Sequence, residues 1–259
     1  MPRFAANLSM MFTEVDFLDR FGAAARAGFK AVEFLFPYAH PAGEIKARLD
    51  EHGLEIALFN FYPGDWDAGE KGLAAMPGRE EEFLASVDQA LEYARALGVP
   101  KLHLMAGLAD PDSADHRARY VKHVRYAAER AAADGVLITL EPLNPYNVPG
   151  YFLPSVAHVL DVLAEIDRPN VKLQYDLYHA QLTDGDITHL TEAVADRIGH
   201  VQLASVPERH EPDRGELYYP YVLATLDRVG YDGWVGCEYN PAGETTAGLG
   251  WLDAYRGQS

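Results

Sequence analysis

Short apolar runs alternate with longer amphipathic segments along the whole chain. Apolar and β-branched side chains dominate the short runs. The longer segments repeat their apolar positions at helical spacing. This alternation is typical of β-strand–α-helix units and differs from the even spacing of all-β proteins. The predicted strands cover residues 3–9, 30–36, 55–61, 101–105, 136–141, 171–176, 200–203 and 233–238.

The segments between the runs are predicted to be helices, at 16–27, 44–51, 80–97, 114–133, 155–166, 187–198 and 219–229. Glycine follows most of these helices, as expected for left-handed C-caps. We expect Gly53 and Gly98 to be such caps, and Gly199 to end the helix before residue 200. Ser155, which follows Pro154, is expected to be an N-cap.

Eight strands, each followed by a helix or by the terminal segment, close best as one (β/α)₈ TIM barrel over residues 1–259. A doubly wound open sheet would also alternate, but the G-x-G-x-x-G fingerprint expected after one of its strands is missing. No linker or low-complexity tract divides the chain. We therefore predict a single α/β domain.

Oxygen-bearing side chains stand at the ends of the last four predicted strands, about one βα unit apart: Glu141, Asp176, Gln202 and Glu238. The carboxyl ends of barrel strands meet at one mouth, where barrel enzymes carry their chemistry. Carboxylates gathered there repel one another unless a cation or a proton joins them. Oxygen ligands favour Mg²⁺ or Mn²⁺ over zinc. The pattern therefore indicates a divalent metal site, although Asp176 taken alone could simply cap the next helix.

Three further residues are candidates for substrate binding. His179, three residues after Asp176, would lie above the ion and could donate a hydrogen bond to a substrate oxygen. Arg209 has the planar fork that matches a carboxylate, although a surface arginine would look the same in sequence. We expect His103 to point into the barrel mouth, with a buried core histidine as the alternative. The long loop 62–72, which contains Trp66, is expected to contact substrate or to be a surface excursion.

Composition narrows the functional classes. The net charge of −17 argues against nucleic acid as a partner, because phosphate binding needs a basic surface. No apolar stretch approaches the roughly 20 residues of a membrane span. Cys237 is the one cysteine and no secretory leader is evident, so we expect a cytoplasmic protein without disulfides. A homo-oligomer is compatible with the sequence, which does not specify one.

Several motifs resemble those of the hydroxypyruvate isomerase family, within the wider set of xylose-isomerase-like barrels. The resemblance runs from about residue 3 to residue 256. The motifs that carry it are Phe4-Ala5-Ala6-Asn7-Leu8-Ser9-Met10, Gly64-Asp65-Trp66-Asp67-Ala68-Gly69-Glu70, Pro77-Gly78-Arg79-Glu80-Glu81, Glu141-Pro142-Leu143-Asn144, Gln174-Tyr175-Asp176-Leu177-Tyr178-His179 and Gly233-Trp234-Val235-Gly236-Cys237-Glu238-Tyr239.

The resemblance implies a divalent metal held by Glu141, Asp176, Gln202 and Glu238, with Glu141 and Glu238 as the proton-transfer pair. It also implies a small hydroxy-oxo acid substrate, with hydroxypyruvate and 2-hydroxy-3-oxopropanoate interconverted through an enediolate. Arg209, Lys71 or Arg79 would hold the substrate carboxylate.

Four other functions stay open. The first is isomerisation of a four-carbon 2-oxo acid, 2-oxo-tetronate, by the same residues. A ketose 3-epimerase is less favoured, because Asn147 and Glu208 stand where related epimerases carry Glu and Arg. A phosphodiester hydrolase on the same barrel is disfavoured by the acidic composition and by the scarcity of His ligands. A non-catalytic barrel that binds a sugar or an acid is the last alternative.

Overall fold

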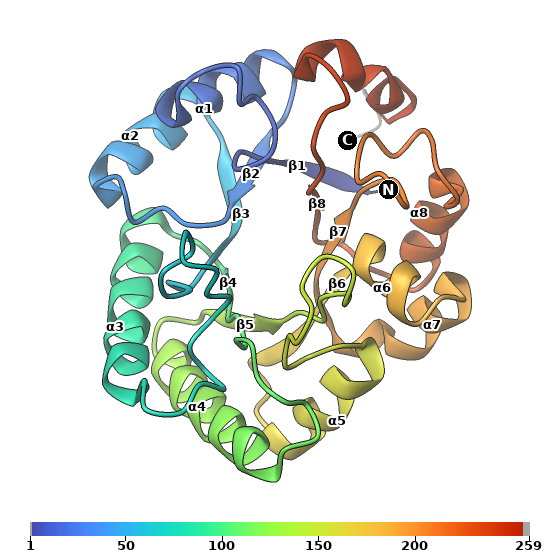
Figure 1. The fold of residues 1–259 in the computed structure, drawn as a ribbon. Coiled ribbons are helices and arrows are strands. Elements are labelled where there is room, and N and C mark those ends of the chain that lie inside the picture. The colour runs from blue at the N-terminus through green and yellow to red at the C-terminus, as the bar shows by residue number, and fades with distance from the viewer. Residues whose placement is uncertain (1, 256–259) are drawn as a thin grey trace.

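Eight parallel strands form a closed barrel in the order β1 to β8, with helices around its outside (Figure 1). The computed structural model describes residues 2–255, so residue 1 and residues 256–259 of the predicted domain lie outside the described part. The barrel closes where β1 pairs with β8. The TIM-barrel prediction is confirmed, and every predicted strand overlaps an observed one. The strands are β1 (Arg3–Asn7), β2 (Ala31–Phe34), β3 (Glu55–Asn60), β4 (Lys101–His103), β5 (Leu137–Leu140), β6 (Val171–Asp176), β7 (Ile198–Leu203) and β8 (Trp234–Cys237).

The helices follow the predicted order, with two additions. The short helix α6 occupies a stretch for which the sequence analysis predicts no element, and the 3₁₀ helix η2 follows β8. No helix within residues 2–255 is long and apolar enough to cross a membrane. The helices are α1 (Phe17–Arg26), α2 (Ala42–His52), α3 (Glu80–Leu97), α4 (Ala114–Ala132), α5 (Val156–Ile166), α6 (Leu177–Thr183), α7 (Ile187–Val194), η1 (Ala195–Arg197), α8 (Tyr219–Arg228) and η2 (Thr245–Ala254).

The predicted caps are right with one exception. Gly53 and Gly98 end their helices with φ of 62° and 71°, and the Ser155 hydroxyl accepts from the His158 N–H at 3.2 Å. The prediction for Gly199 is wrong, because this residue lies inside β7. A Cβ at Gly199 would come within 2.8 Å of the Lys172 Cβ, so glycine there permits close packing between strands rather than a turn.

The inside of the barrel changes character along its axis. Ala5, Ala31 and Ala57 form a small cluster apart from the main core. Asn7 and Glu33 lie two residues further along β1 and β2, so their side chains point to the same side of the sheet. From this level upward, toward the carboxyl ends of the strands, the interior carries buried polar groups instead of the branched apolar side chains usual in such barrels.

The loop between β3 and α3 is anchored beside the carboxyl end of the barrel. Gly72 forms an antiparallel bridge with Ala106, and Trp66 packs its ring 5.0 Å from that of Phe36. Gly72 has φ of 120°, and a Cβ there would lie 2.4 Å from the Met105 carbonyl oxygen. Glycine at this position is therefore required by both conformation and space.

Replacing Gly72 with alanine should destabilise the protein by about 1–3 kcal/mol, because the backbone would be strained and must move away from Met105. Gly43→Ala is the matched control. Gly43 lies in α2, and nothing lies within 4 Å of a Cβ added there, so that change should stabilise by about 0.4–1 kcal/mol. Denaturant unfolding measures both changes. Equal effects would contradict this account of the loop.

Candidate active site

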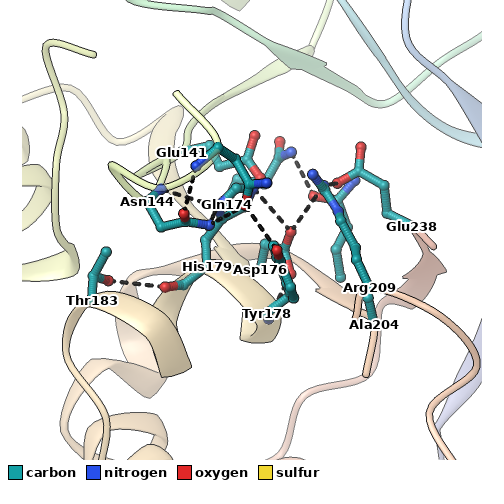
Figure 2. A network of polar contacts seen from close by, with 12 residues as sticks. Glu141, Asn144, Gln174, Asp176, Tyr178, His179, Thr183, Ala204, Arg209 and Glu238 are labelled. Atoms are coloured by element: carbon teal, nitrogen blue, oxygen red, sulfur yellow. Dashed lines mark hydrogen bonds and ion pairs between the residues drawn. The ribbon is translucent and has the colours of Figure 1, made fainter. Parts of the chain in front are cut away.

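Three buried carboxylates lie at the carboxyl end of the barrel. Glu141 directly follows β5, Asp176 ends β6 and Glu238 directly follows β8. Their exposed fractions are 4%, 1% and 5%. Arg209, from the loop between β7 and α8, reaches in among them (Figure 2). The four side chains come from segments far apart in the sequence, so the convergence expected from the strand ends is present for these residues.

One guanidinium faces the carboxylates. The Arg209 Nη2 lies 3.0 Å from Glu238 Oε2 and 3.7 Å from Asp176 Oδ2. Its guanidinium carbon sits 4.8 Å from the ring centre of Tyr178, which supports the cation from one face. Among residues 2–255, Arg209 is the one permanent cation that forms an ion pair with any of these three acids, and it pairs with Glu238 and Asp176. The cluster therefore holds more potential negative charge than one arginine can balance.

Burial raises the pKa of all three carboxyls. For Glu141 the pKa is raised first by burial and then by the charges of Glu238 and Asp176. Burial also raises the pKa of Asp176 and of Glu238, while Arg209 acts in the opposite direction on both. The ionised forms are thus costly as the site stands, and a second cation would relieve that cost.

Two carboxylate oxygens are turned toward the place where such a cation would bind. Glu141 Oε1 and Asp176 Oδ2 are buried and have no hydrogen-bond partner among the described residues. The other Asp176 oxygen accepts from the Tyr178 N–H at 2.8 Å and so caps α6. Asp176 therefore serves as the cap and leaves one oxygen for the site. Ligand atoms of Glu141, Asp176 and His179 all lie within 4.8 Å of one another.

His179 belongs to this group by distance, but its protonation makes it a donor. Its Nδ1 lies 3.0 Å from the Asn144 backbone nitrogen, whose N–H must donate, so Nδ1 is the unprotonated acceptor. Burial lowers the pKa of His179 well below its usual value, which leaves the ring neutral with its proton on Nε2. That Nε2 lies 3.7 Å from Asp176 Oδ2. In this tautomer Nε2 carries a proton and is not a metal ligand, and the predicted hydrogen bond from His179 to a substrate oxygen stays a prediction.

His103 and Gln202 lie close to the carboxylates, in different surroundings. His103 is buried, and its Nδ1 is 3.5 Å from Glu141 Oε2. Burial lowers its pKa to about 3, so the ring is neutral. The Gln202 amide accepts from Gln174 Nε2 at 2.7 Å and donates to Glu33 Oε1 at 2.8 Å. Its carbonyl oxygen keeps a second lone pair, so the predicted role as a ligand stays a prediction.

The sequence analysis missed polar residues in two places, beneath the site and at its rim. Glu33 and Asn7 point into the barrel from β2 and β1, and both are buried. Asn144 and Asn147 shape the rim: the Asn147 oxygen accepts from the Tyr178 hydroxyl and from the Asn144 amide, each at 2.8 Å. One signal was available for Glu33, because it stands alone between Val32 and Phe34 in a buried run. An ionisable residue in such a run needs a partner or a function.

Comparison with known proteins relates most of the chain to one family. Residues 21–255 match the family described as xylose isomerase-like TIM barrel. A 2-oxo-tetronate isomerase of Cupriavidus necator is 54% identical over the full length of both chains. The hydroxypyruvate isomerase of Escherichia coli is 45% identical, covering 99% of this chain and 100% of that protein. A Brucella melitensis crystal structure described as an AP endonuclease of family 2 has a TM-score of 0.96 and 52% identity, over 99% of this chain and 100% of that one.

Replacing Arg209 with glutamine should destabilise the metal-free protein by about 3 kcal/mol, because Glu238 and Asp176 would lose their buried cation. Added Mn²⁺ should recover part of this loss, since a bound ion restores the positive charge. Arg214→Gln is the control in the same loop: Arg214 forms an exposed pair with Asp213, and its loss should change stability by less than about 0.5 kcal/mol. Thermal unfolding with and without Mn²⁺ tests this. Equal effects of the two substitutions would refute the charge balance described above.

Proposed function

The chain belongs to the xylose isomerase-like TIM barrel family, in its hydroxypyruvate isomerase and 2-oxo-tetronate isomerase group, and we propose that it isomerises the four-carbon acid 2-oxo-tetronate. The isomerase class follows from the family. The choice of acid rests on the higher identity to the relative named for 2-oxo-tetronate, 54% against 45% for the hydroxypyruvate isomerase. The similarity thus favours 2-oxo-tetronate over hydroxypyruvate, the acid that the sequence analysis favours.

The two acids need the same chemistry. Each carries a carboxylate, a carbonyl at C2 and a hydroxyl at C3. Isomerisation removes the hydrogen on C3, passes through an enediolate and returns a proton to C2. The four-carbon acid differs by a hydroxymethyl group on C3. Discrimination between the acids therefore depends on how the site receives that group, and a hydrogen bond to its hydroxyl would give the larger preference.

The donor set fits a hard divalent cation. The one observation that carries the proposal is the buried group of Glu141, Asp176 and Glu238, with two oxygens that have no hydrogen-bond partner within residues 2–255. Glu141, Asp176, Glu238 and the Gln202 carbonyl would hold such an ion, and oxygen donors of this kind suit Mg²⁺ or Mn²⁺. When bound, the ion would supply positive charge that polarises the substrate carbonyl and acidifies the neighbouring C–H.

The two glutamates are the proposed proton carriers. They stand on β5 and β8, and both are buried. In the site without an ion, burial raises the pKa of both carboxyls, so each holds a proton more readily than an exposed glutamate does. One glutamate, ionised, removes the proton from C3, and the other, in its acid form, delivers a proton to C2. The proton of the C3 hydroxyl passes to the C2 oxygen, so the two glutamates end with their protonation states exchanged. The His179 Nε2–H donates to a substrate oxygen and steadies the enediolate charge.

Arg209 is the proposed partner of the substrate carboxylate. Its Nε is buried and has no hydrogen-bond partner in the described part of the chain, so this N–H can donate to a substrate while Nη2 stays on Glu238. The alternatives from the sequence are less suited. Arg79 is already paired with Glu70 and Glu82, and the Lys71 ammonium lies 3.4 Å over the Trp66 ring. His103, beside Glu141, is proposed to contact the substrate as well.

With Mg²⁺ or Mn²⁺ present, kcat/KM for 2-oxo-tetronate should exceed that for hydroxypyruvate by about 10-fold or more, because the extra hydroxyl offers a further hydrogen bond. EDTA should abolish turnover of both acids. Glu141→Gln and Glu238→Gln should each lower kcat by about 100-fold or more, since each removes one proton carrier.

Glu165→Gln is the control for these measurements, because Glu165 forms an ion pair with Arg117 on the helix surface and should not affect kcat. A preference for hydroxypyruvate would return the assignment to the three-carbon acid. Turnover that EDTA leaves intact would refute the proposed ion. Cleavage of abasic DNA, with no isomerisation of either acid, would overturn the proposal in favour of a hydrolase.

A further inference from the structure

A single buried glutamate on β2 connects two of the proposed site residues. Glu33 is fully buried in the barrel interior. Its Oε1 accepts from Gln202 Nε2 at 2.8 Å and from Asn7 Nδ2 at 3.1 Å. Its Oε2 lies 2.7 Å from His200 Nε2. The two amide groups donate to Glu33, so its Oε1 acts as an acceptor.

This acceptor fixes the direction of a chain of amides. Because the Gln202 NH₂ must face Glu33, the Gln202 oxygen faces the other way and accepts from Gln174 Nε2. The Gln174 oxygen then accepts from the Thr139 hydroxyl at 2.7 Å. Reversing either amide would bring like groups into contact. The Gln202 carbonyl, the group expected to meet a metal ion, is thus oriented from below by Glu33.

A second set of hydrogen bonds, through Asn7, connects Glu33 to Glu238. The Asn7 amide nitrogen lies 3.1 Å from Glu33 Oε1 and 3.4 Å from Glu238 Oε1, so one NH₂ group holds both carboxylates. The other Glu238 oxygen is held by Arg209. Glu238 therefore has one oxygen fixed from inside the barrel and one fixed from its rim.

A glycine on β8 leaves space for the Glu33 carboxylate. A Cβ at Gly236 would lie 2.3 Å from both Glu33 oxygens, so only glycine at this position of β8 leaves the space that the side chain occupies. His200 is suited to its part. Its Nε2 faces Glu33 Oε2 at 2.7 Å, and its Nδ1 has no hydrogen-bond partner among residues 2–255.

We propose that Glu33 is a positioning residue that orients the Gln202 amide for the divalent ion and, through Asn7, holds Glu238 for proton transfer. It does not touch substrate, and it acts through these two residues. The inference rests on the proposed function, since it assigns Gln202 to the ion and Glu238 to the proton. Partners that orient the ligands of a metal commonly change its affinity by 10- to 100-fold when they are removed.

The test uses Glu33→Gln, which keeps the shape and adds an NH₂ group among donors. The Mn²⁺ dissociation constant, measured by calorimetry on metal-free protein, should rise by about 10-fold or more. At saturating Mn²⁺, kcat for 2-oxo-tetronate should also fall by about 10-fold or more while KM changes less, because Glu238 is displaced and the substrate contacts remain. Asn7→Ala removes only the hydrogen bonds that connect Glu33 to Glu238, so it should lower kcat and raise the Mn²⁺ dissociation constant by less than Glu33→Gln does.

Thr191→Val is the control for a purely structural effect. The Thr191 hydroxyl is buried on α7 and bonds to the Ile187 carbonyl and the Tyr175 hydroxyl, outside this network. Thr191→Val should lower the unfolding midpoint and leave the Mn²⁺ dissociation constant and kcat unchanged. If Glu33→Gln folds and keeps the wild-type Mn²⁺ affinity and kcat, the positioning role of Glu33 is overturned and the proposed function stands. If Glu33→Gln does not fold, a wild-type kcat in Asn7→Ala overturns the proposal.

Wild-type protein that binds Mn²⁺ but isomerises neither acid would refute the proposed function, and the Mn²⁺ constants would still decide the role of Glu33. Wild-type protein that binds no ion would overturn both.

Discussion

The charge balance at the carboxyl end of the barrel constrains the rest of the structure. Glu141, Asp176 and Glu238 are removed from water, and one arginine serves them. Ionised carboxylates in such a place are costly unless a cation is near. A guanidinium supported by Tyr178 offsets part of this charge, and two of the carboxylate oxygens have no hydrogen-bond partner among residues 2–255. We regard the cluster as a site prepared for a divalent ion rather than as a contribution to stability.

Buried polar side chains also occupy the barrel interior below the three carboxylates. In many barrels branched apolar side chains fill the layers below the mouth. Here Glu33, His200 and the amides of Gln174 and Gln202 are connected by hydrogen bonds in that space, and only the His200 Nδ1 among these contacts is left without one. A connected polar network of this kind specifies one arrangement of its members. The network replaces apolar packing in these layers, and its hydrogen bonds position the residues directly above it.

Much of the architecture could be predicted from the sequence, because strand and helix periodicities and glycine caps are local signals. The ends of the strands also indicated Glu141, Asp176 and Glu238, since chain order and barrel topology together bring them to one mouth. The tautomer of His179 could not be predicted, because it depends on the Asn144 N–H from another loop. The contacts of Glu33 could not be predicted for the same reason, because its partners lie on two other strands, β1 and β7. Gly199 was taken for a helix end because close packing between strands leaves no local signal.

The central claim is that the buried carboxylates form a binding site for one divalent ion. The most direct measurement is titration of metal-free protein with Mn²⁺, following free ion by its paramagnetic resonance signal. We predict one ion bound per chain, displaced by excess Mg²⁺, and affinity weakened by more than about 100-fold in Asp176→Asn, which changes the carboxylate that faces both Arg209 and His179. No binding by the wild-type chain, or equal binding by Asp176→Asn, would contradict the account.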